Sequence, residues 1–370
     1  MALENGMDER TTELARLREI IDTLDTKILL LLNERFEIAL RIGRLKGSIV
    51  DPVREDEVLS HVRSVSNELL VGSKFAERMY ASVLQRSREL QSGSAKLIGF
   101  QGEHGAYSEI AALKFIAEVL RERAVTLPFR TFEDIIDNVE RGLIDYGILP
   151  VQNSLEGPIP SATYALLESD LYVVCEIVLP IRHCLLTLPE TDPRNIRFVY
   201  SHPQALAQCR NFLKRLSLES VEYYDTAGAA RKLASERMSN AAAIGSELAA
   251  KIYGLEVLKE SIQDYPHNRT SFWILSKETR ATGSKCAVTF LLEDRPGALL
   301  GVLEYFKSRE VNLTRIVSLP SRSEPHVYRF FVDFETERVL DSFDVFVAGL
   351  KAKTMELRML GLYDSLVVER

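Results

Sequence analysis

The sequence predicts a multidomain protein with an all-α segment at the N-terminus, a two-lobed α/β segment in the middle and a small α+β segment at the C-terminus. Three observations lead to this fold class. The chain has 370 residues, more than the roughly 100–200 of a typical domain. Near residue 92 the helical spacing of apolar residues gives way to strands that alternate with helices. After a polar stretch at 278–285 the order of elements changes again. We therefore expect domains at residues 1–92, 96–278 and 285–370.

Composition and charge exclude several classes of protein. Hydrophobic residues make up 46% and charged residues 27%, as in globular proteins, and the net charge of -7 argues against a nucleic-acid partner. No apolar run approaches the roughly 20 residues that cross a bilayer, and the first residues lack the apolar core of a signal peptide, so we expect a cytoplasmic protein without a membrane partner. The widely spaced cysteines predict buried free thiols rather than a metal or redox site: Cys175, Cys184, Cys209 and Cys286.

The N-terminal segment, residues 12–91, has few turn signals and predicts three helices. A break at Gly47 and Ser48 ends the first helix, Asp51 and Pro52 begin the second, and the third spans 75–91. Three helices of this length make a poor monomeric core, so we expect a partner chain in a homodimer or homotetramer. The first helix carries an apolar stripe at spacings of three and four residues: Leu14, Leu17, Ile21, Leu24, Ile28, Leu31 and Leu32.

The middle segment follows a short polar linker at 91–96 and alternates strands with helices, the latter at 109–121 and 205–216 among others. This alternation predicts parallel, doubly wound sheets, and two strand clusters predict two lobes with a cleft between them. Strands are expected at 97–101, 145–151, 172–180, 184–189, 197–201, 221–224, 241–245 and 271–276.

The C-terminal segment has the order strand, helix, strand, strand, helix, strand, which is that of a ferredoxin-like module. Its expected strands are 287–292, 313–319, 327–335 and 357–361, and its expected helices are 298–309 and 341–353.

Three cations interrupt the apolar sequence of the first segment: Arg18, Arg35 and Lys46. Arg35 and Lys46 are about three helical turns apart and share a face, whereas Arg18 falls roughly 100° away. One chain cannot easily aim all three at one point, but Arg18 of a second chain could join the other two. Ser87 and Gln91 share a face of the third helix. Spacing alone leaves open that the three cations are solvated surface charges.

The motifs LREIIDTLD, ER, GRLK, DPVRE and SRELQ, in this order, resemble the all-helical chorismate mutase family over the whole first segment. The resemblance implies that Arg35 and Arg18 of a second chain clamp the carboxylates of chorismate. It implies further that Lys46 and Gln91 meet the ether oxygen. A pericyclic rearrangement needs a held conformer and positive charge at the breaking C–O bond, which Arg forks and a Lys ammonium can supply.

The same resemblance implies roles for four more residues. Ser87 would lie near a carboxylate, and Asp51, Arg54 and Glu55 would surround the ring hydroxyl. The loop after Lys46 is short relative to some members of the family, which leaves the roles of Asp51 and Arg54 open.

Polar groups stand at four predicted strand-to-helix junctions, at 102–108, 152–154, 201–204 and 225–226. In open α/β sheets ligands bind at this edge, where helix N-termini offer free N–H groups to anions. Each group alone could merely cap a helix. Four together favour a cleft that binds a small polyanion.

The motifs GxxGAYSExAA, YGILPVQNSLEG, SHPQALAQC, YDTAGAA and NRTSF resemble the prephenate dehydratase family over about residues 97–277. The resemblance implies a two-lobed α/β domain like the periplasmic binding proteins, and the removal of hydroxyl and carbon dioxide from prephenate. Thr270 would donate a hydrogen bond to the leaving hydroxyl. His202 is interpreted as a structural or capping histidine rather than a general acid. The implied pocket residues are Asn153, Ser154, Ser201, Gln208, Asp225 and Phe272.

Two positions depart from the usual pattern of that family. Gln152 stands where the family usually has Glu, and Ser271 stands where it usually has Arg. If the two positions face each other, their joint loss is a compensated swap, because the loss of one charge alone would leave the other unpaired. The alternative is altered chemistry, such as decarboxylation of prephenate without loss of the hydroxyl, or a prephenate-like substrate such as arogenate.

The sequence DRPGAL at 294–299, followed by an amphipathic helix, resembles the ACT domain. The resemblance implies an amino-acid effector site at Gly297, Ala298 and Leu299. The dehydratase family commonly has ESRP where this chain has VSLP at 317–320, so Val317 and Leu319 replace charged residues. Phenylalanine as effector, another effector and a purely structural dimerisation role all remain open.

Together the resemblances predict a bifunctional enzyme that converts chorismate to prephenate and prephenate to phenylpyruvate. The sequence has no metal-ligand cluster, nucleotide-binding loop or nucleophile triad, so we expect chemistry without a cofactor or metal. One alternative keeps the mutase and makes the second domain a prephenate decarboxylase or arogenate dehydratase. Another makes the last two domains an effector-binding regulator without chemistry of its own.

Overall fold

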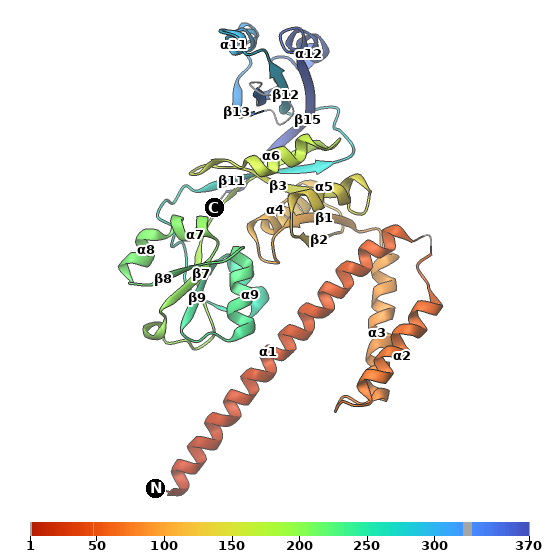
Figure 1. Cartoon of the computed structure of the whole chain (residues 1–370), viewed down its shortest axis with the longest axis vertical. Helices are drawn as coiled ribbons and strands as arrows, with labels where there is room; N and C mark the ends of the chain where they lie inside the picture. Colours follow the sequence, from red (N-terminus) through yellow and green to blue (C-terminus); the bar gives the residue numbers. More distant parts are fainter. Residues whose placement is uncertain (1, 47, 321–327, 370) are drawn as a thin grey trace. The chain divides into compact units, whose positions relative to one another are not determined.

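The computed structural model describes the backbone of every residue except 1, 47, 321–327 and 370. Within this range the chain forms two compact units (Figure 1). The helical unit comprises residues 1–95 with 234–237, and the mixed unit comprises residues 96–233 and 238–370.

The helical unit is built from α1 (Ala2–Leu45), α2 (Pro52–Ser66) and α3 (Ser73–Gln91). The Asp51 carboxylate accepts a hydrogen bond from the Arg54 N–H and caps α2, and Pro52 takes the first helical position, as the sequence predicts. Gly47, part of the predicted break after α1, lies outside the described residues. Gly43 lets α3 approach α1 closely, because a Cβ at this position would lie 2.9 Å from the Cγ of Gln91.

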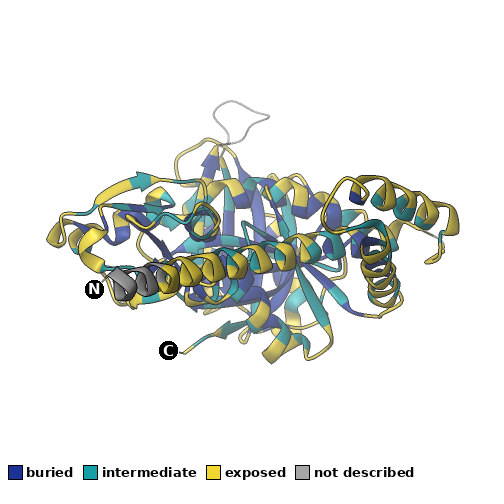
Figure 2. Cartoon of the chain, turned by 90° about the horizontal axis from the view of Figure 1, so that it is seen from below, coloured by how far each residue is buried: buried dark blue, intermediate teal, exposed yellow. Residues whose placement is uncertain are grey.

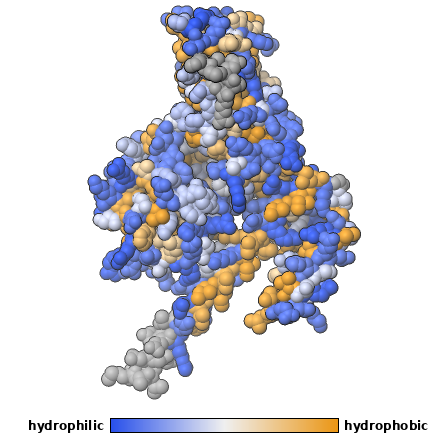
Figure 3. Space-filling view, viewed as in Figure 1, coloured by the Kyte–Doolittle hydropathy of each residue, from blue (hydrophilic) through white to orange (hydrophobic). Residues whose placement is uncertain are grey.

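The core of the helical unit is small, and much of α1 is exposed (Figure 2). Apolar residues gather along α1 in Figure 3. Six residues of the predicted stripe are between 48% and 63% exposed: Leu14, Leu17, Ile21, Leu24, Ile28 and Leu31. An apolar face of this length is unfavourable in water, so it supports the expectation that a second chain covers it.

The mixed unit begins with an α/β part. Its helices are α4 (Tyr107–Phe115), α5 (Phe132–Glu140), α6 (Pro160–Leu167), α7 (Pro203–Gln208), α8 (Arg210–Arg215), α9 (Thr226–Glu236) and α10 (Glu247–Tyr253), with short helical turns at Ile116–Leu120 and Pro193–Asn195. Its strands are β1 (Lys96–Gln101), β2 (Ala124–Phe129), β3 (Tyr146–Asn153), β4 (Gly157–Pro158), β5 (Tyr172–Pro180), β6 (Cys184–Thr187), β7 (Phe198–Ser201), β8 (Glu219–Glu222), β9 (Ala241–Gly245), β10 (Glu256–Lys259) and β11 (Arg269–Ser276).

The strands form two sheets, which define two lobes as predicted. The larger sheet has the order β13-β14-β12-β15-β5-β11-β3-β1-β2, with β4 beside β3, and the smaller has the order β10-β6-β9-β7-β8. The expectation of parallel sheets is wrong for several strands. β1 pairs in parallel with β2 and β3, but β11 is antiparallel to β3 and β5, and β6 is antiparallel to β9 and β10. The chain leaves the larger sheet after β5 to build the second lobe and returns as β11, which therefore enters in the opposite direction.

The sequence does not predict β2, and it misjudges two helices. Pro128 argues against a strand, but β2 lies at the edge of its sheet, where a missing N–H is tolerated. The helix expected at 109–121 starts at Tyr107 and continues beyond Phe115 as a π-helical turn. The helix expected at 205–216 is two short helices that meet at Cys209.

The C-terminal part has the predicted βαββαβ order. It consists of β12 (Lys285–Leu292), α11 (Ala298–Ser308), β13 (Leu313–Pro320), β14 (Tyr328–Glu335), a helical turn (Leu340–Ser342), α12 (Phe343–Lys351) and β15 (Glu356–Val367). The last strand is longer than the expected 357–361. Beyond Gly361 it pairs in parallel with β5, Asp364–Val367 opposite Cys175–Val178, and so joins the C-terminal part to the larger sheet of the α/β part. Predicted strand residue 327 lies outside the described residues.

Candidate active sites

The helical unit brings four of the predicted residues into two pairs. The Arg35 guanidinium donates a hydrogen bond to the Ser87 hydroxyl at 2.8 Å, which links α1 to α3. The Lys46 ammonium lies 2.8 Å from a carboxylate oxygen of Asp51 and lowers the pKa of that carboxyl. Gln91 donates from its amide to the Ala39 carbonyl at 2.7 Å. Since residues 35, 39, 43 and 46 share one face of α1, these groups line one side of the helix.

Other predicted residues of the helical unit have different surroundings. Glu55 accepts a hydrogen bond from Arg88 at 2.6 Å, and Arg88 was not among the predicted site residues. Its only sequence signal was its place next to Ser87 in the motif SRELQ. Arg54 turns to Glu57, 2.8 Å away, and both side chains are exposed. Arg18 is exposed and lies 17 residues before Arg35 on the same continuous helix, about 25 Å along its axis, so the two cannot meet within one chain.

The α/β part holds a cavity of about 190 Å³. Five of the predicted residues line it: Asn153, Gln208, Asp225, Thr270 and Phe272. The lining also includes His202, predicted only to cap a helix, and His183, for which the sequence predicts no role. Two predicted residues do not line it. The Ser201 hydroxyl is fully buried and donates to the Ile244 carbonyl at 2.7 Å. The exposed Ser154 accepts a hydrogen bond from the Arg269 N–H at 2.9 Å.

The two histidines of the cavity wall differ. His202 caps α7, because its Nδ1 accepts a hydrogen bond from the Gln204 N–H at 3.3 Å, which confirms the capping interpretation. His183 is 2% exposed, and burial lowers the pKa of its imidazole to about 4 despite an opposing hydrogen bond to Gln208. His183 is therefore neutral at physiological pH.

A continuous series of hydrogen bonds follows the cavity wall, and we call it the polar chain: Thr270, Asn153, Asn268, Gln208, His183 and Tyr107. The Asn153 amide N–H₂ faces three acceptors, which share its two hydrogens: the Asn268 carbonyl oxygen at 2.8 Å, the Thr270 hydroxyl oxygen at 3.0 Å and the Arg269 backbone carbonyl at 3.2 Å. The Asn268 amide donates to the Gln208 oxygen at 2.7 Å, and His183 Nε2 lies 3.0 Å from the same oxygen. The Tyr107 hydroxyl lies 2.9 Å from His183 Nδ1.

The direction of every bond in the polar chain from Thr270 to His183 follows from its first amide. The Asn153 oxygen accepts from the backbone N–H groups of Leu155 and Glu156, which can only donate, so the N–H₂ group must face Thr270. The Thr270 oxygen therefore accepts, and its own hydrogen remains available to donate into the cavity. At the other end the Gln208 oxygen can only accept, so Nε2 of His183 carries the proton.

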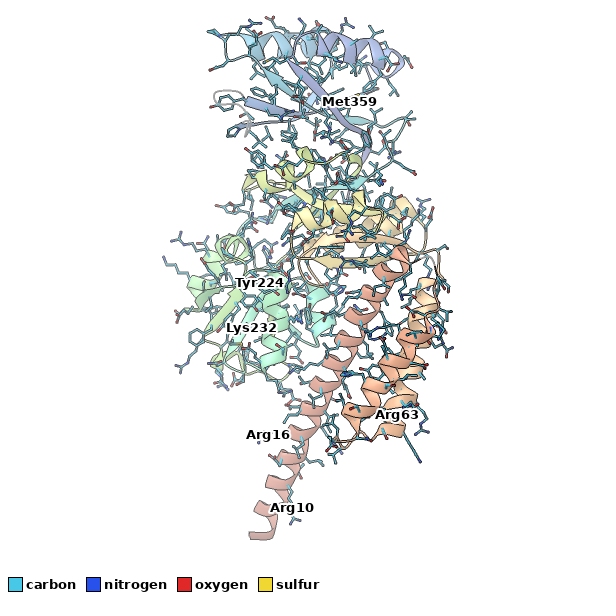
Figure 4. All side chains as sticks on the ribbon, turned by 45° about the vertical axis from the view of Figure 1, so that its right-hand side comes forward. Arg10, Arg16, Arg63, Tyr224, Lys232 and Met359 are labelled. Atoms are coloured by element: carbon cyan, nitrogen blue, oxygen red, sulfur yellow. The ribbon has the colours of Figure 1, made fainter. Side chains whose placement is uncertain are left out.

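Asp225 is the one acidic residue of the described cavity lining, and that lining includes no lysine or arginine. One carboxylate oxygen accepts from the N–H groups of Gly228 at 2.9 Å and Glu103 at 3.3 Å. Burial raises the pKa of this carboxyl, although these backbone bonds oppose the rise. Tyr224, labelled in Figure 4, also lines the cavity, and its hydroxyl donates to Glu103 at 2.7 Å.

Gln152 and Ser271 are opposite each other on β3 and β11, so the two positions that depart from the usual pattern are cross-strand neighbours. Neither side chain lines the cavity. The Gln152 oxygen instead accepts a hydrogen bond from Arg315 of β13 at 2.7 Å. This arrangement agrees with the compensated swap, because both changed positions lie side by side and away from the cavity.

The predicted effector residues begin α11. Gly297 precedes the helix with a φ of 84°, a conformation that favours glycine, and Ala298 and Leu299 form the first turn. Val317 and Leu319 lie in β13, as the strand prediction requires.

Three further expectations concern the whole described chain. All four cysteines are buried free thiols, as predicted. Within the described part of the chain, no helix combines the length and apolar character needed to cross a bilayer. Among the same residues, no three His, Cys, Asp or Glu side chains gather in a way that could hold a metal ion.

Comparison with known proteins matches the N-terminal and the middle segments of the chain to two families. Residues 17–92 match chorismate mutase type II, and residues 98–280 match prephenate dehydratase. A bifunctional chorismate mutase/prephenate dehydratase of Aquifex aeolicus (strain VF5) is 35% identical over 371 residues, covering 96% of this chain and 99% of that protein. The chloroplastic arogenate dehydratase/prephenate dehydratase 2 of Arabidopsis thaliana is 38% identical over 292 residues, 75% of each chain. The solved prephenate dehydratase of Arthrobacter aurescens in complex with L-Phe is 30% identical with a TM-score of 0.65, covering 72% of this chain and 90% of that one.

Proposed function

The chain belongs to the bifunctional chorismate mutase/prephenate dehydratase family, which acts in phenylalanine biosynthesis, and from this premise we propose how its residues perform the two reactions. The first reaction rearranges chorismate to prephenate. The second removes the ring hydroxyl and carbon dioxide from prephenate and leaves phenylpyruvate.

In the mutase site, Arg35 and Arg18 of a second chain bind the two carboxylates of chorismate. Lys46 leaves Asp51 and places its ammonium at the ether oxygen, where negative charge develops as the C–O bond breaks. Gln91 supports the same oxygen, and Ser87 keeps the Arg35 fork in place. No proton needs to move, so the site acts by conformation and charge alone.

In the dehydratase site, Thr270 donates a hydrogen bond to the departing hydroxyl. The observation that supports this role is the direction of the Asn153 amide, which obliges the Thr270 oxygen to accept and leaves its hydrogen for the substrate. The bond from the ring to its carboxylate breaks, and the electron pair enters the ring. The C–O bond at the opposite carbon then breaks, and the hydroxide that leaves is stabilised by Thr270.

The experiment is to supply chorismate to the purified protein and identify every product by mass spectrometry. The wild type should form phenylpyruvate. Thr270→Val keeps the shape but lacks the hydroxyl, so prephenate should accumulate with the dehydratase kcat lower by about 10²–10³. Thr270→Ser should retain most of the activity. A Thr270→Val variant that still forms phenylpyruvate at the wild-type rate would exclude the proposed role.

Arogenate is a second candidate substrate of the same cavity. It carries an ammonium group where prephenate has a keto oxygen, and Asp225 places a carboxylate in a cavity whose described lining contains no cation. A partly desolvated carboxylate favours an ammonium group as its partner. The similarity to a protein described as arogenate dehydratase/prephenate dehydratase supports this reading.

Asp225→Asn tests the second substrate. Asparagine can still accept the backbone bonds that cap α9, but it carries no charge. The ratio of kcat/KM for arogenate to that for prephenate should fall about 10- to 100-fold, which corresponds to the loss of a charge-assisted bond. An unchanged ratio, or no turnover of arogenate by the wild type, would exclude this candidate.

The C-terminal part, residues 285–370, acts as an ACT-type regulatory domain. Its strand order and the glycine turn before α11 support this assignment. Phenylalanine is the effector to test first, because the related Arthrobacter aurescens structure is a complex with L-Phe. The exposed apolar face of α1 supports a homodimer or a larger homo-oligomer.

A further inference from the structure

We propose that Arg315 is a positioning residue for the dehydratase reaction: it holds Gln152 in place and thereby fixes the neighbouring Asn153, which orients Thr270. The proposal rests on the role given above to Thr270. It assigns part of the dehydratase geometry to a residue of the C-terminal part, which lies outside the cavity.

The Arg315 side chain is buried, with 8% of it exposed. Its Nε donates to the Gln152 oxygen at 2.7 Å, and one terminal nitrogen donates to Glu176 at 2.8 Å. The other terminal nitrogen lies 2.7 Å from Asp333, and the group stacks 5.1 Å from the centre of the Trp273 ring. Two sides of the planar fork are therefore hydrogen-bonded, and the third makes an ion pair without a hydrogen bond, which together leave the group little freedom to move.

The charges around Arg315 are balanced. Glu176 and Asp333 are each 2% exposed, and they face two cations, Arg315 and Lys285, the latter 2.8 Å from Glu176. The hydrogen bond to Gln152 joins the charged Arg315 guanidinium, as donor, to a neutral amide oxygen, as acceptor. Removing Arg315 would leave the buried Asp333 without its cation and Glu176 with Lys285 alone, so the loss of Arg315 is costly.

Gln152 depends on this contact because the strand pairing around it is irregular. In the ladder between β3 and β11, Ser271 is opposite Gln152 but Phe272 is opposite Pro150, so Val151 is an extra residue on β3. Pro150 has no N–H to donate to the ladder. On its other edge this stretch pairs only with the two-residue β4, Gln152 opposite Pro158 and Asn153 opposite Gly157. Regular pairing therefore restrains it only in part, and the Arg315 bond adds a restraint.

Asn153 follows Gln152 directly and is opposite Thr270. Side chains of successive strand residues point to opposite faces, so Asn153 reaches the cavity while Gln152 reaches Arg315. A rotation of the strand that released Gln152 would also tilt the Asn153 amide away from Thr270. The same Arg315 group is anchored to β5 through Glu176, so the restraint spans three neighbouring strands of the larger sheet.

The test uses substitutions at Gln152 with dehydratase kcat and KM measured separately. Gln152→Leu removes the acceptor, and we expect kcat to fall about tenfold or more with KM changed less than about threefold, since small displacements of reacting groups can cost up to about 100-fold in rate. Gln152→Glu keeps an acceptor at the same place and should stay within about threefold of wild type. Mutase activity of the same chains should be unchanged, which reports that the helical unit is folded, and the melting temperature reports on the mixed unit.

Ser365→Ala is the matched control. It removes a 2.8 Å hydrogen bond from the same charged cluster, at Glu176, without touching β3. It should lower the melting temperature about as much as Gln152→Leu and leave the dehydratase kcat unchanged. Equal losses of kcat in Ser365→Ala and Gln152→Leu would overturn the proposal, because they would show a general loss of structure.

Arg315→Lys completes the test. Lysine keeps the positive charge beside Glu176 and Asp333 but cannot bind Gln152 at the same time. Its kcat should fall by a factor similar to that of Gln152→Leu, and the double variant should be no slower than either single variant. Multiplication of the two effects in the double variant would contradict action through Gln152. A Gln152→Leu chain with the wild-type kcat would also contradict the proposal. Loss of kcat in Gln152→Leu but not in Ser365→Ala would show that losing the positioning contact lowers the rate, with the role of Thr270 unchanged.

Discussion

Asn153 shows how a single amide can set the direction of the hydrogen bonds of a neighbouring hydroxyl, here that of Thr270, the proposed donor. Two backbone N–H groups fix its oxygen, and its N–H₂ group then faces Thr270. In Asn153→Asp the carboxylate still accepts both backbone bonds but cannot donate. The Thr270 hydroxyl must then turn and donate to Asp, so we expect the dehydratase kcat to fall by about 10²–10³. The measurement is phenylpyruvate formation from prephenate, with the melting temperature as a check. Wild-type turnover in this variant would show that the direction of the amide is irrelevant.

His183 predicts a pH dependence of stability. Burial lowers its pKa to about 4 in the folded state, below its ordinary value of 6.5. The neutral form is favoured in the fold, so this contribution is complete above pH 6.5 and is lost as the pH falls from 6.5 towards 4. At 1.36 kcal/mol per pKa unit, the loss approaches about 3 kcal/mol. The free energy of unfolding of the α/β part in urea should differ less between pH 7 and pH 5 in His183→Gln than in wild type. Equal differences in the two proteins would contradict this.

At the scale of single residues, the sequence predicts the part of the site that lies in recognisable motifs. Asn153, Gln208, Asp225, Thr270 and Phe272 were all identified and all line the cavity. His183 lies in none of the quoted motifs, and Asn268 was assigned no role although it begins the motif NRTSF, because the importance of both arises from hydrogen bonds between distant segments. The prediction that Ser201 lines the pocket was wrong, because its hydroxyl donates a hydrogen bond to the backbone of a neighbouring strand.

At the scale of elements, the contact between α1 and α3 depends on Gly43. A glycine inside a helix usually costs about 1 kcal/mol relative to alanine, so Gly43→Ala would ordinarily stabilise α1. Here the added Cβ would lie 2.9 Å from the Cγ and 3.2 Å from the Cβ of Gln91 and displace that side chain. We expect mutase kcat to fall about tenfold. Dehydratase activity serves as the control and should not change. A fully active mutase would show that Gln91 tolerates the shift.

The elements that sequence patterns predict are those with a clear internal period. All three helices of the first segment were found, the first from apolar spacing that continues over several turns, and the second from the break after it and the start at Asp51 and Pro52. β2 was missed because its proline is acceptable only at a sheet edge, and edge position is a property of the fold. The full length of β15 was missed because residues 364–367 are strand through pairing with β5, almost 190 residues away in the chain, while Leu362 and Tyr363 still pair with β12.

At the scale of the whole molecule, the proposed mutase site requires Arg18 of a second chain. Arg35 and Lys46 lie on one face of α1, and the exposed apolar stripe continues towards Arg18, too far away to reach them. A second chain that covers the stripe in the antiparallel direction would bring its own Arg18 to Arg35 and bury the apolar residues at once. Mutase activity would then require assembly of two chains. The polar chain of the dehydratase site, by contrast, is formed by the residues of a single protein molecule.

Mixing two inactive variants tests this shared site. Arg18→Ala and Arg35→Ala should each abolish mutase activity, because every site lacks one arginine. A mixed dimer has one site with both arginines and one site with neither. If chains exchange at random, half of the dimers are mixed, and activity should return to about a quarter of wild type. Dehydratase activity should remain at the wild-type level throughout and confirm the protein concentration. A mixture that stays inactive after unfolding and refolding together would show that both arginines serve the same chain, and that the stripe on α1 has another purpose.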